Sequence, residues 1–395
     1  MKSMLKRDMY SEISALVNWY AAVDPRYADI ALPITKREDL MRLPISSRKD
    51  LLSYGHTIPI REMVHVHATS GSTTQSIYVS VSPRAYEARK RRLARVFASA
   101  GLKPGDRVLN MFGYELNGAG RIVEQSLLSA GIGVIPVSGD TLEQRLERAV
   151  ELVRMFKPVA INAYTGQLFD VLSRLDKGHS VKRCVASGEP LANAYRTMLE
   201  GSAGVEIHNM YAAVEFVVFG VSRAADDGYI RLFDDEAVFE VIDTAGRSLD
   251  EGKGDLLVTD PDNKAMPIIR YRLGDQVEII RRADGRYIKV LGRTSESFLI
   301  RGAIYYVREI SDVIEAVLKR PKFLVVIKKD LETYQDSVSL YLSQEDMASE
   351  KELRAALKRS FGFWQSVKIL CRKEAFPTLP NGKLVRFLDA REKVS

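Results

Sequence analysis

Cysteine is almost absent from this chain of 395 residues, which contains only Cys184 and Cys371. Two cysteines so far apart in sequence indicate neither a disulfide framework nor a zinc cluster, and they fit a reducing compartment. Long apolar runs are missing as well, so we expect no transmembrane helix, which needs about 18 consecutive apolar residues. The N-terminus is charged and lacks the apolar segment of a signal peptide. We therefore expect a cytoplasmic protein without a membrane partner.

Histidine is also scarce, with five residues in the whole chain. His65 and His67 fall on one side of an expected strand, where they could form part of a metal site. Because no third ligand lies near them in sequence, two surface histidines are the favoured interpretation. Cys184 lies in an apolar stretch with no base near it in sequence, so we expect a buried and unreactive thiol.

Acidic residues are outnumbered by basic ones, 51 to 58, which gives a net charge of +7. A positive balance can indicate a nucleic-acid partner, but a polyanionic small molecule fits a modest excess equally well. The densest basic run, at residues 84–95, has apolar residues at helical spacing. It is therefore predicted to be the solvated face of a helix rather than a nucleic-acid patch, and we expect no nucleic-acid partner.

The order of apolar and polar residues divides the chain into two domains. Between residues 83 and 199 helical and strand patterns alternate, which predicts a mostly parallel sheet flanked by helices. Short strand patterns from residue 205 to 280 predict an antiparallel region. Residues 293–395 have a separate pattern that includes an expected helix at residues 307–318. We expect an α/β fold with a large N-terminal domain at residues 1–292 and a small α+β domain at residues 293–395.

One hydroxyl-rich segment lies between two expected strands. Residues 68–76 read Ala-Thr-Ser-Gly-Ser-Thr-Thr-Gln-Ser, and alternating apolar and polar residues flank them. Such residues present backbone N–H groups and hydroxyl donors with little bulk, which suits the oxygens of a polyphosphate. An ordinary hairpin turn has the same composition, so the segment alone leaves both interpretations open. The common P-loop is excluded, because Gly71 is not followed at the required spacing by Gly-Lys-Ser or Gly-Lys-Thr.

Four further segments stand out. One places Tyr211 and Glu215 four positions apart, and another ends with Asp275 in a glycine turn. A third lies at the expected domain joint, and the fourth projects Lys383 near the C-terminus. The four segments are residues 209–215, 267–275, 292–302 and 380–386. Each has a simple structural explanation when it is taken alone.

Together and in this order, the five segments resemble the motifs of the adenylate-forming superfamily, which includes acyl-CoA synthetases, luciferase-like ligases and peptide-synthetase adenylation domains. The resemblance is closest to the phenylacetate-CoA ligase branch. Residues 32–40 and the run Ser-Gly-Glu-Pro at residues 187–190 are similar to segments of those ligases. The matches extend from about residue 32 to residue 390.

The resemblance implies a reaction in two steps. A carboxylate is a poor electrophile, so it first attacks the α-phosphate of ATP, and an acyl-adenylate and pyrophosphate form. The thiol of CoA then displaces AMP and yields a thioester. The implied substrates are ATP, CoA and an aromatic or otherwise bulky carboxylic acid, and the implied metal is Mg²⁺. Transfer of the acyl group to a carrier protein or an amine stays open as an alternative.

The resemblance also implies a nucleotide site. Hydroxyl groups of the loop hold the β- and γ-phosphates, Tyr211 stacks on adenine, and Asp275 accepts the ribose hydroxyls with help from Arg293. The expected nucleotide-binding residues are Thr69, Ser70, Gly71, Ser72, Thr73, Gly188, Glu189, Pro190, Asn209, Tyr211, Asp275 and Arg293.

Two residues are expected to carry catalysis. Glu215 binds Mg²⁺, and Lys383 bridges the carboxylate and the α-phosphate during adenylation. In the second step the small domain rotates, withdraws Lys383 and brings Arg301 and Gly302 to the tunnel through which the thiol enters.

The acid pocket is expected between the parallel sheet and residues 205–222. Its expected walls are Phe112, Tyr114, Tyr164 and Phe216. Each of these aromatic residues is equally well explained as part of the core.

The chain departs from the family pattern at several positions. The loop after Thr73 lacks the second glycine and the lysine, and Ala212 and Val214 replace a glycine and a hydroxyl residue. Ser295 stands where the family has a hinge aspartate. A lost neutral donor costs roughly 1 kcal/mol, and more when it is buried, so slow or specialised use of ATP is one expectation. A catalytically weak nucleotide-binding protein is the alternative from another class, and nothing in the sequence excludes a homodimer.

Overall fold

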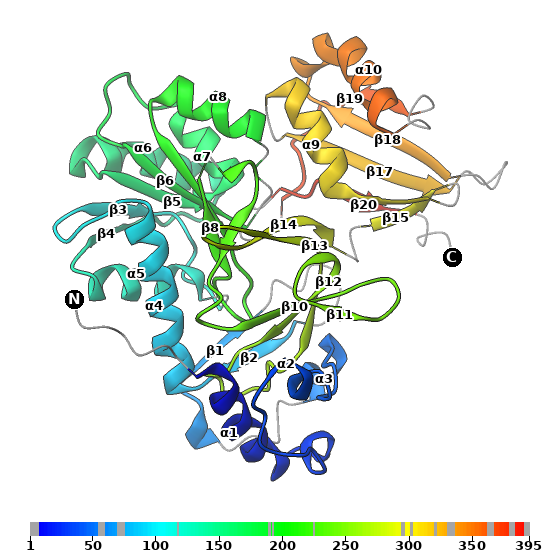
Figure 1. Ribbon diagram of the computed structural model, residues 1–395. Coiled ribbons are helices and arrows are strands. Elements are labelled where there is room, and N and C mark those ends of the chain that lie inside the picture. The colour runs from blue at the N-terminus through cyan, green and yellow to red at the C-terminus, as the bar shows by residue number, and fades with distance from the viewer. Residues whose placement is uncertain are drawn as a thin grey trace.

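The computed structural model describes residues 8–53, 60–68, 76–116, 118–188, 191, 193–223, 226–293, 297–300, 303–319, 322–329, 336–361, 367–378 and 384–390. These residues form a twelve-stranded sheet with helices on both faces, a four-stranded sheet near the C-terminus and two short hairpins (Figure 1).

Five parallel strands make up one half of the large sheet. In spatial order they are β4 (Gly133–Pro136), β3 (Arg107–Asn110), β5 (Ala160–Tyr164), β6 (Arg183–Ser187) and β7 (Glu206–Tyr211). Two helices pack on one face, α4 (Pro83–Ser99) and α5 (Ala119–Ser129). Three pack on the other, α6 (Leu142–Phe156), α7 (Thr165–Leu172) and α8 (Asn193–Ala203). The predicted parallel sheet flanked by helices is confirmed, and coverage of both faces explains the nearly continuous apolar strands.

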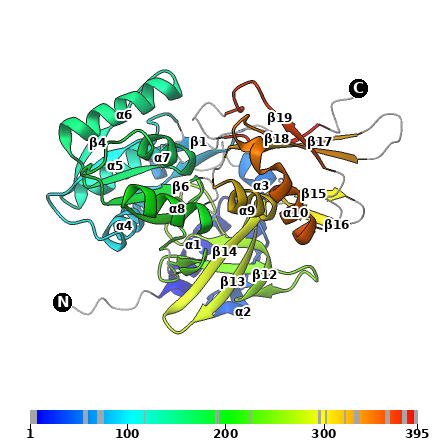
Figure 2. The same cartoon turned by 90° about the horizontal axis from the view of Figure 1, so that it is seen from above.

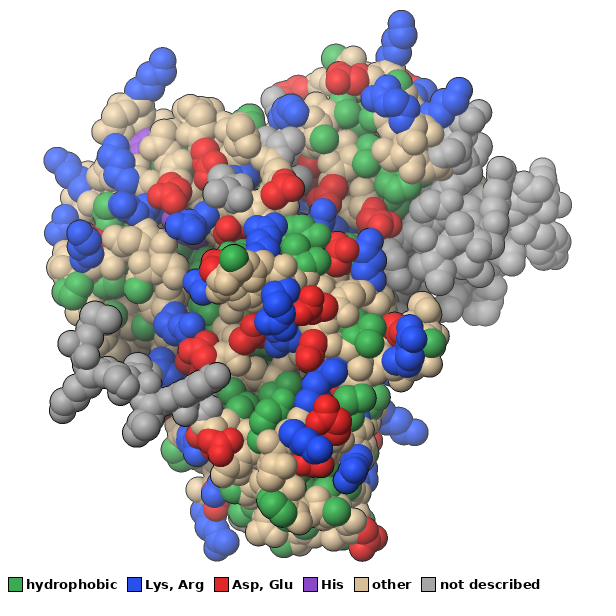
Figure 3. Space-filling view, in the orientation of Figure 1, with side chains coloured by type: hydrophobic (Ala, Val, Ile, Leu, Met, Phe, Trp, Pro, Cys, Tyr) green, Lys and Arg blue, Asp and Glu red, His purple; other side chains and the backbone are tan. Residues whose placement is uncertain are grey.

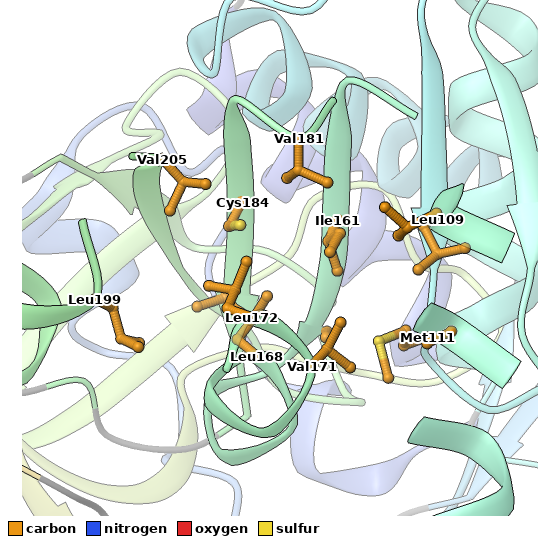
Figure 4. Packing of buried hydrophobic residues seen from close by; sticks show 14 of the residues in the cluster. Leu109, Met111, Ile161, Leu168, Val171, Leu172, Val181, Cys184, Leu199 and Val205 are labelled. Atoms are coloured by element: carbon orange, nitrogen blue, oxygen red, sulfur yellow. The ribbon is translucent and has the colours of Figure 1, made fainter. Parts of the chain in front are cut away.

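The face covered by α6, α7 and α8 holds a core of aliphatic side chains. Figure 4 shows Leu168 and Val171 of α7 lying against Ile161 of β5 and Cys184 of β6. Cys184 is fully buried, as predicted, and burial raises the pKa of its thiol to about 12.

The other half of the large sheet is antiparallel. Its strands are β8 (Gly220–Ser222), β9 (Ile230–Leu232), β14 (Gly285–Arg293), β13 (Tyr271–Arg282), β12 (Gly252–Thr259), β10 (Val238–Ile242) and β11 (Ser248–Leu249). Strand β7 joins the halves, because it is parallel to β6 and antiparallel to β8. The sequence assigned β7 to the antiparallel region; in the structure it is the last parallel strand, and one sheet runs through both regions.

The N-terminal part covers the antiparallel half. Its helices are α1 (Met9–Ala21), η1 (Pro25–Tyr27), α2 (Arg37–Leu40), α3 (Arg48–Ser53) and η3 (Ile60–Glu62). Side chains of α1, η1 and α2 pack on Ile269, which precedes β13. Strands β1 (His65–Ala68) and β2 (Tyr78–Val81) pair antiparallel, so the predicted strands on either side of the hydroxyl-rich segment are confirmed.

The C-terminal part has a core of its own. Its elements are β15 (Ser297–Ile300), β16 (Ala303–Tyr306), α9 (Val307–Leu318), β17 (Phe323–Lys329), β18 (Asp336–Leu342), η6 (Asp346–Ser349), α10 (Glu350–Phe361), β19 (Lys368–Cys371) and β20 (Phe387–Asp389). The apolar faces of α9 and α10 pack on the sheet β19-β18-β17-β20, which confirms the expected α+β pattern. Strand β14 continues to Arg293, so the boundary after residue 292 stays a prediction.

The C-terminal part contacts the parallel half of the large sheet. Figure 2 shows α9 beside α8, and these helices are in contact. The Lys322 ammonium lies 2.8 Å from a carboxylate oxygen of Asp170 on α7. This ion pair joins residues that are 152 positions apart in sequence.

The basic run on α4 is not a solvated face throughout, so that interpretation is wrong for two of its residues. Arg89 and Arg92 are 0% exposed, whereas the side chain of Arg91 is 46% exposed. The reason is that α4 packs against the loop after β7 and against Asp260 and Asp262, which supply buried acceptors for these arginines. Apolar periodicity does not reveal such acceptors, because they come from distant segments.

The surface interpretation of the histidine pair is wrong for His67. This residue is 1% exposed, and its ring centroid lies 4.6 Å from that of His65. The segment before α5 covers β1, as the hydrogen bond from Ala68 N to Leu116 O at 2.9 Å shows. The described residues contain no group of three or more His, Cys, Asp or Glu side chains that could hold a metal ion.

Within the described ranges, no helix is both long enough and apolar enough to cross a membrane. On the face shown in Figure 3, basic and acidic side chains of the described residues are interspersed rather than gathered by sign. Part of the positive charge is also withdrawn from the surface, since Arg89, Arg92 and Arg196 are buried.

Candidate active site

The predicted nucleotide-binding residues that the structure describes gather where the sheet changes from parallel to antiparallel. Gly188 follows β6, Tyr211 ends β7, and Asp275 and Arg293 lie on β13 and β14. In open α/β sheets ligands bind outside the carboxyl ends of the parallel strands, and Gly188 and Tyr211 lie at these ends of β6 and β7. Asn209, which is 8% exposed, is two residues before Tyr211 on β7, so the two side chains share one face of the strand.

The Asp275 carboxylate is held from two sides. The hydroxyl of Tyr211 donates a hydrogen bond to one of its oxygens, and Arg293 Nε donates to the other at 3.0 Å. Asp275 and Arg293 are direct partners in the pairing of β13 with β14. Asp275 is 3% exposed, whereas the side chain of Arg293 is 53% exposed. An ionised carboxylate has about four acceptor positions, so two remain for vicinal hydroxyl groups of a ligand.

Tyr211 stays protonated at neutral pH. Burial, followed by the nearby charge of Asp275, raises the pKa of its hydroxyl well above the ordinary value. One face of its ring stacks on Phe219, with centroids 4.5 Å apart and planes inclined by 24°. The hydrogen bond from Phe219 N to Tyr211 O at 2.9 Å fixes this arrangement. A stacked base would therefore use the opposite face of the ring.

Glu215 lies in the loop between β7 and β8. It is 7% exposed, and burial is the largest cause of the raised pKa of its carboxyl group. The Tyr271 hydroxyl donates a hydrogen bond to Glu215 Oε1 at 3.3 Å. Mg²⁺ is typically bound by one or two carboxylates together with substrate phosphates and water. Glu215 forms no ion pair with the residues that the structure describes, so a bound metal ion would favour the ionised carboxylate.

Gly188 is needed for its conformation and for the space that it leaves. Its φ is +78°, in the region that favours glycine. A Cβ atom at this position would lie 2.6 Å from the ring of Tyr164. The Tyr164 ring packs in turn on Phe112, with centroids 4.8 Å apart. Glycine thus allows β6 to turn directly over an aromatic pair.

Acid–CoA ligases are among the known proteins to which this chain is similar in sequence. The chain is 27% identical over 385 residues to phenylacetate-coenzyme A ligase of Aromatoleum evansii, covering 90% of this chain and 86% of the relative. It is 28% identical to phenylacetate-coenzyme A ligase of Thermus thermophilus, with 90% and 88% covered. Indoleacetate–lysine synthetase of Pseudomonas savastanoi is 21% identical, with 76% and 77% covered. No protein-family model matches the chain.

Solved structures show the same fold. A 2-hydroxyisobutyryl-CoA ligase in the postadenylation state, in complex with 2-HIB-AMP, gives a TM-score of 0.81 at 18% identity, covering 97% of this chain and 89% of the other. The chain has the fold of the adenylate-forming CoA ligases. The same ligase in its thioesterification state gives a TM-score of 0.64 at 19% identity, with 96% and 89% covered.

The resemblance to phenylacetate-CoA ligases is thereby confirmed for most of the chain, but the comparisons do not test single residues. Of the expected site residues of this adenylate-forming fold, ten lie outside the described residues, and their roles stay predictions. They are Thr69, Ser70, Gly71, Ser72, Thr73, Glu189, Pro190, Arg301, Gly302 and Lys383.

The expected walls of the acid pocket separate into two places. Phe112 and Tyr164 pack together beside Gly188. Tyr114 is half-buried, and burial together with a hydrogen bond to Glu124 raises the pKa of its hydroxyl to about 12. Phe216 is fully buried in another cluster, where its ring lies 5.9 Å from that of Phe239. This placement matches the core interpretation of Phe216.

Sequence reasoning missed three residues around Glu215. Tyr271, which bonds to the carboxylate, lies in the segment 267–275 that ends with Asp275, so its place in that segment was the signal that could have found it. Arg89 and Arg92 donate to the main chain of the Glu215 loop. No pattern in the sequence indicated them, since the partners are more than 120 positions apart.

Proposed function

We propose that this chain is an adenylate-forming acid–thiol ligase that activates an aromatic or bulky carboxylic acid with ATP and transfers the acyl group to CoA. The observation that carries the proposal is the buried Asp275 carboxylate, held by Tyr211 and Arg293 beside the buried Glu215 at the turning point of the sheet. Similarity to phenylacetate-coenzyme A ligases over 90% of the chain supports the same activity.

The reaction transfers the acyl group twice. In the first step an oxygen of the acid forms a bond to the α-phosphorus of ATP, and the bond from this phosphorus to pyrophosphate breaks. In the second step the sulfur of CoA forms a bond to the acyl carbon, its proton is released and AMP leaves. Little covalent help from the protein is needed, because positioning and charge stabilisation supply the rate.

Asp275 binds the nucleotide through its ribose, and two neighbours keep the carboxylate in place. The neutral Tyr211 hydroxyl occupies one carboxylate oxygen without adding charge, while the guanidinium of Arg293 holds the other. Glu215 would hold Mg²⁺ together with the phosphates of ATP. When bound, the metal neutralises charge that develops on the phosphate oxygens. Lys383 would contact the carboxylate and the α-phosphate from the C-terminal domain, residues 293–395.

The acid would enter beside the pair formed by Phe112 and Tyr164, which lies next to Gly188. An aromatic wall favours an arylacetic or related acid, because stacked or edge-on rings attract one another by about 0.5–1.5 kcal/mol. We place the protein in the cytoplasm, where both ATP and CoA are available and where its two cysteines stay reduced.

A second candidate keeps the first step and changes the acceptor. The similarity to indoleacetate–lysine synthetase over 76% of the chain favours an amine in place of the thiol. Chemically the acyl-adenylate serves both acceptors, because either nucleophile displaces AMP from the same carbonyl carbon.

The experiment is an assay of pyrophosphate release with ATP and Mg²⁺ across a panel of aryl and alkyl carboxylic acids. Each acid is tested alone, with CoA and with lysine, and products are identified by mass spectrometry. We expect release with an arylacetic acid, faster turnover with CoA and a thioester product. Faster turnover with lysine and an amide product would support the second candidate instead. Absence of release with every acid, although ATP binds, would contradict both.

A further inference from the structure

Two buried arginines of α4 reach the loop that carries Glu215. Arg89 and Arg92 are three positions apart, so they lie on one side of the helix. Arg89 Nη2 donates a hydrogen bond to the backbone carbonyl of Glu215 at 2.6 Å. Arg92 Nη1 donates to the next carbonyl, that of Phe216, at 3.2 Å. The helix thus holds two successive carbonyl groups of the loop.

Arg92 is neutralised by carboxylates around it. Its Nη2 lies 3.1 Å from Asp260 and 3.3 Å from Asp262, and its Nε lies 3.6 Å from Glu236. Its guanidinium also lies over the Phe216 ring, 3.7 Å from the centroid. Removal of Arg92 would leave buried acidic groups without their cation, which is strongly destabilising. A substitution of Arg92 would therefore destabilise the fold and could not show whether this residue acts on the site.

Arg89 differs in its surroundings. Among the described residues it forms no ion pair, and its Nε and Nη1 are buried without a hydrogen-bond partner there. A buried cation with only a carbonyl partner costs free energy, because water is lost without full compensation. A methionine of similar length would avoid that cost. We therefore expect Arg89 to fix the geometry of the Glu215 loop and not to raise the stability of the fold.

The loop is strained at a position next to the two carbonyl groups. Val217 has a φ of +78°, which is an outlier for a β-branched residue. Such a conformation is unfavourable for a residue with a Cβ atom and persists only where surrounding contacts enforce it. Here Val217 N donates to Ala213 O at 2.6 Å, and Arg89 and Arg92 hold the two residues before it. Loss of one of these contacts would let the loop relax and move the Glu215 side chain.

We propose that Arg89 is a positioning residue that, by holding the Glu215 carbonyl, places the Glu215 carboxylate where it binds the Mg²⁺ of the ATP complex. The inference rests on the proposed function, because it takes Glu215 as the metal-binding residue. Groups that orient a metal-binding side chain typically change metal affinity by about 10- to 100-fold when they are removed.

The test compares Arg89→Met, Arg89→Lys and the control Arg91→Met. Arg91 is on the same helix and loses the same charge, but its side chain is 46% exposed, and its partner Glu236 keeps contacts with Arg92 and Arg95. The Mg²⁺ concentration for half-maximal pyrophosphate release is measured at saturating ATP and acid. We expect an increase of about 10-fold for Arg89→Met, a smaller one for Arg89→Lys, which keeps a donor, and none for the control.

A binding measurement separates this inference from the proposed activity. Calorimetric titration of ATP, with and without Mg²⁺, needs no turnover. For Arg89→Met we expect ATP to bind as in the parent chain without Mg²⁺ and to lose most of the gain in affinity that Mg²⁺ provides. A parent chain that releases no pyrophosphate would contradict the proposed function, while this titration would still decide the role of Arg89.

An unchanged dependence on Mg²⁺ in a folded Arg89→Met variant would overturn the inference. Thermal unfolding shows whether the variant is folded. If it is not, Arg89→Lys takes its place, because lysine keeps a cation and a donor but cannot reproduce the geometry of the guanidinium. Arg89→Lys is then expected to raise the required Mg²⁺ concentration, and an unchanged value would overturn the inference equally.

Discussion

Substitution of Gly188 by alanine tests whether the turn after β6 is built around the Tyr164 ring. Two penalties are expected. The first is conformational, since a φ of +78° costs a residue with a Cβ atom about 1–2 kcal/mol. The second is steric, because the added Cβ would lie 2.6 and 2.7 Å from two carbon atoms of the Tyr164 ring. Tyr164 is 8% exposed and packs on Phe112, so it cannot turn aside freely.

Overpacking of this kind costs about 1–3 kcal/mol. The sum predicts that Gly188→Ala lowers the free energy of unfolding by about 2–5 kcal/mol. Gly178→Ala is the matched control. Gly178 has a φ of +85°, but no atom lies within 4 Å of its added Cβ, so only the conformational penalty of about 1–2 kcal/mol applies. The difference between the two variants therefore isolates the contact with Tyr164.

Urea unfolding of both variants, followed by circular dichroism, measures that difference under the same conditions. We expect Gly188→Ala to unfold at a clearly lower urea concentration than Gly178→Ala. Only Gly188→Ala is also expected to weaken ATP-dependent activation of the acid, because its turn lies next to the proposed pocket. Equal unfolding midpoints for the two variants would refute the reasoning, because they would show that Tyr164 and Phe112 move to make room for the added methyl group.

Three further outcomes are expected. Burial keeps the pKa of Cys184 at about 12, so at pH 8.5 a thiol reagent should label Cys371 in the native protein and Cys184 only after unfolding; native labelling of both, quantified by mass spectrometry, would contradict this. Asp275→Asn should raise the KM for ATP by at least about 10-fold, since a charged acceptor contributes roughly 1.5–3 kcal/mol, and an unchanged KM would exclude a ribose contact. Lys322→Met removes the ion pair to Asp170 between the C-terminal part and α7 and should lower the free energy of unfolding by no more than about 1 kcal/mol, because the Lys322 side chain is partly exposed; a larger loss in urea unfolding would contradict this.

Local patterns in the sequence determined much of the fold. The helix expected from apolar residues between positions 307 and 318 is α9, because residues at helical spacing mark its buried face. Strands β1 and β2 were likewise visible as alternating residues on both sides of the hydroxyl-rich segment. Short, ordered motifs were enough to indicate the fold of the adenylate-forming ligases, since each motif needs only neighbouring residues.

Contacts between distant segments were decided by the tertiary structure alone. Alternation shows that β7 is a strand. Its parallel pairing with β6 and antiparallel pairing with β8 depend on how the connecting segments place these strands in the sheet. The hydrogen bond between Tyr211 and Asp275 spans 64 positions, and that between Arg89 and Glu215 spans 126. A charged residue is expected at the surface unless a buried partner is known, and the partner of Arg89 comes from another part of the chain. For this reason the sequence could only name candidate residues of the site, whereas the fold showed what surrounds those that the structure describes.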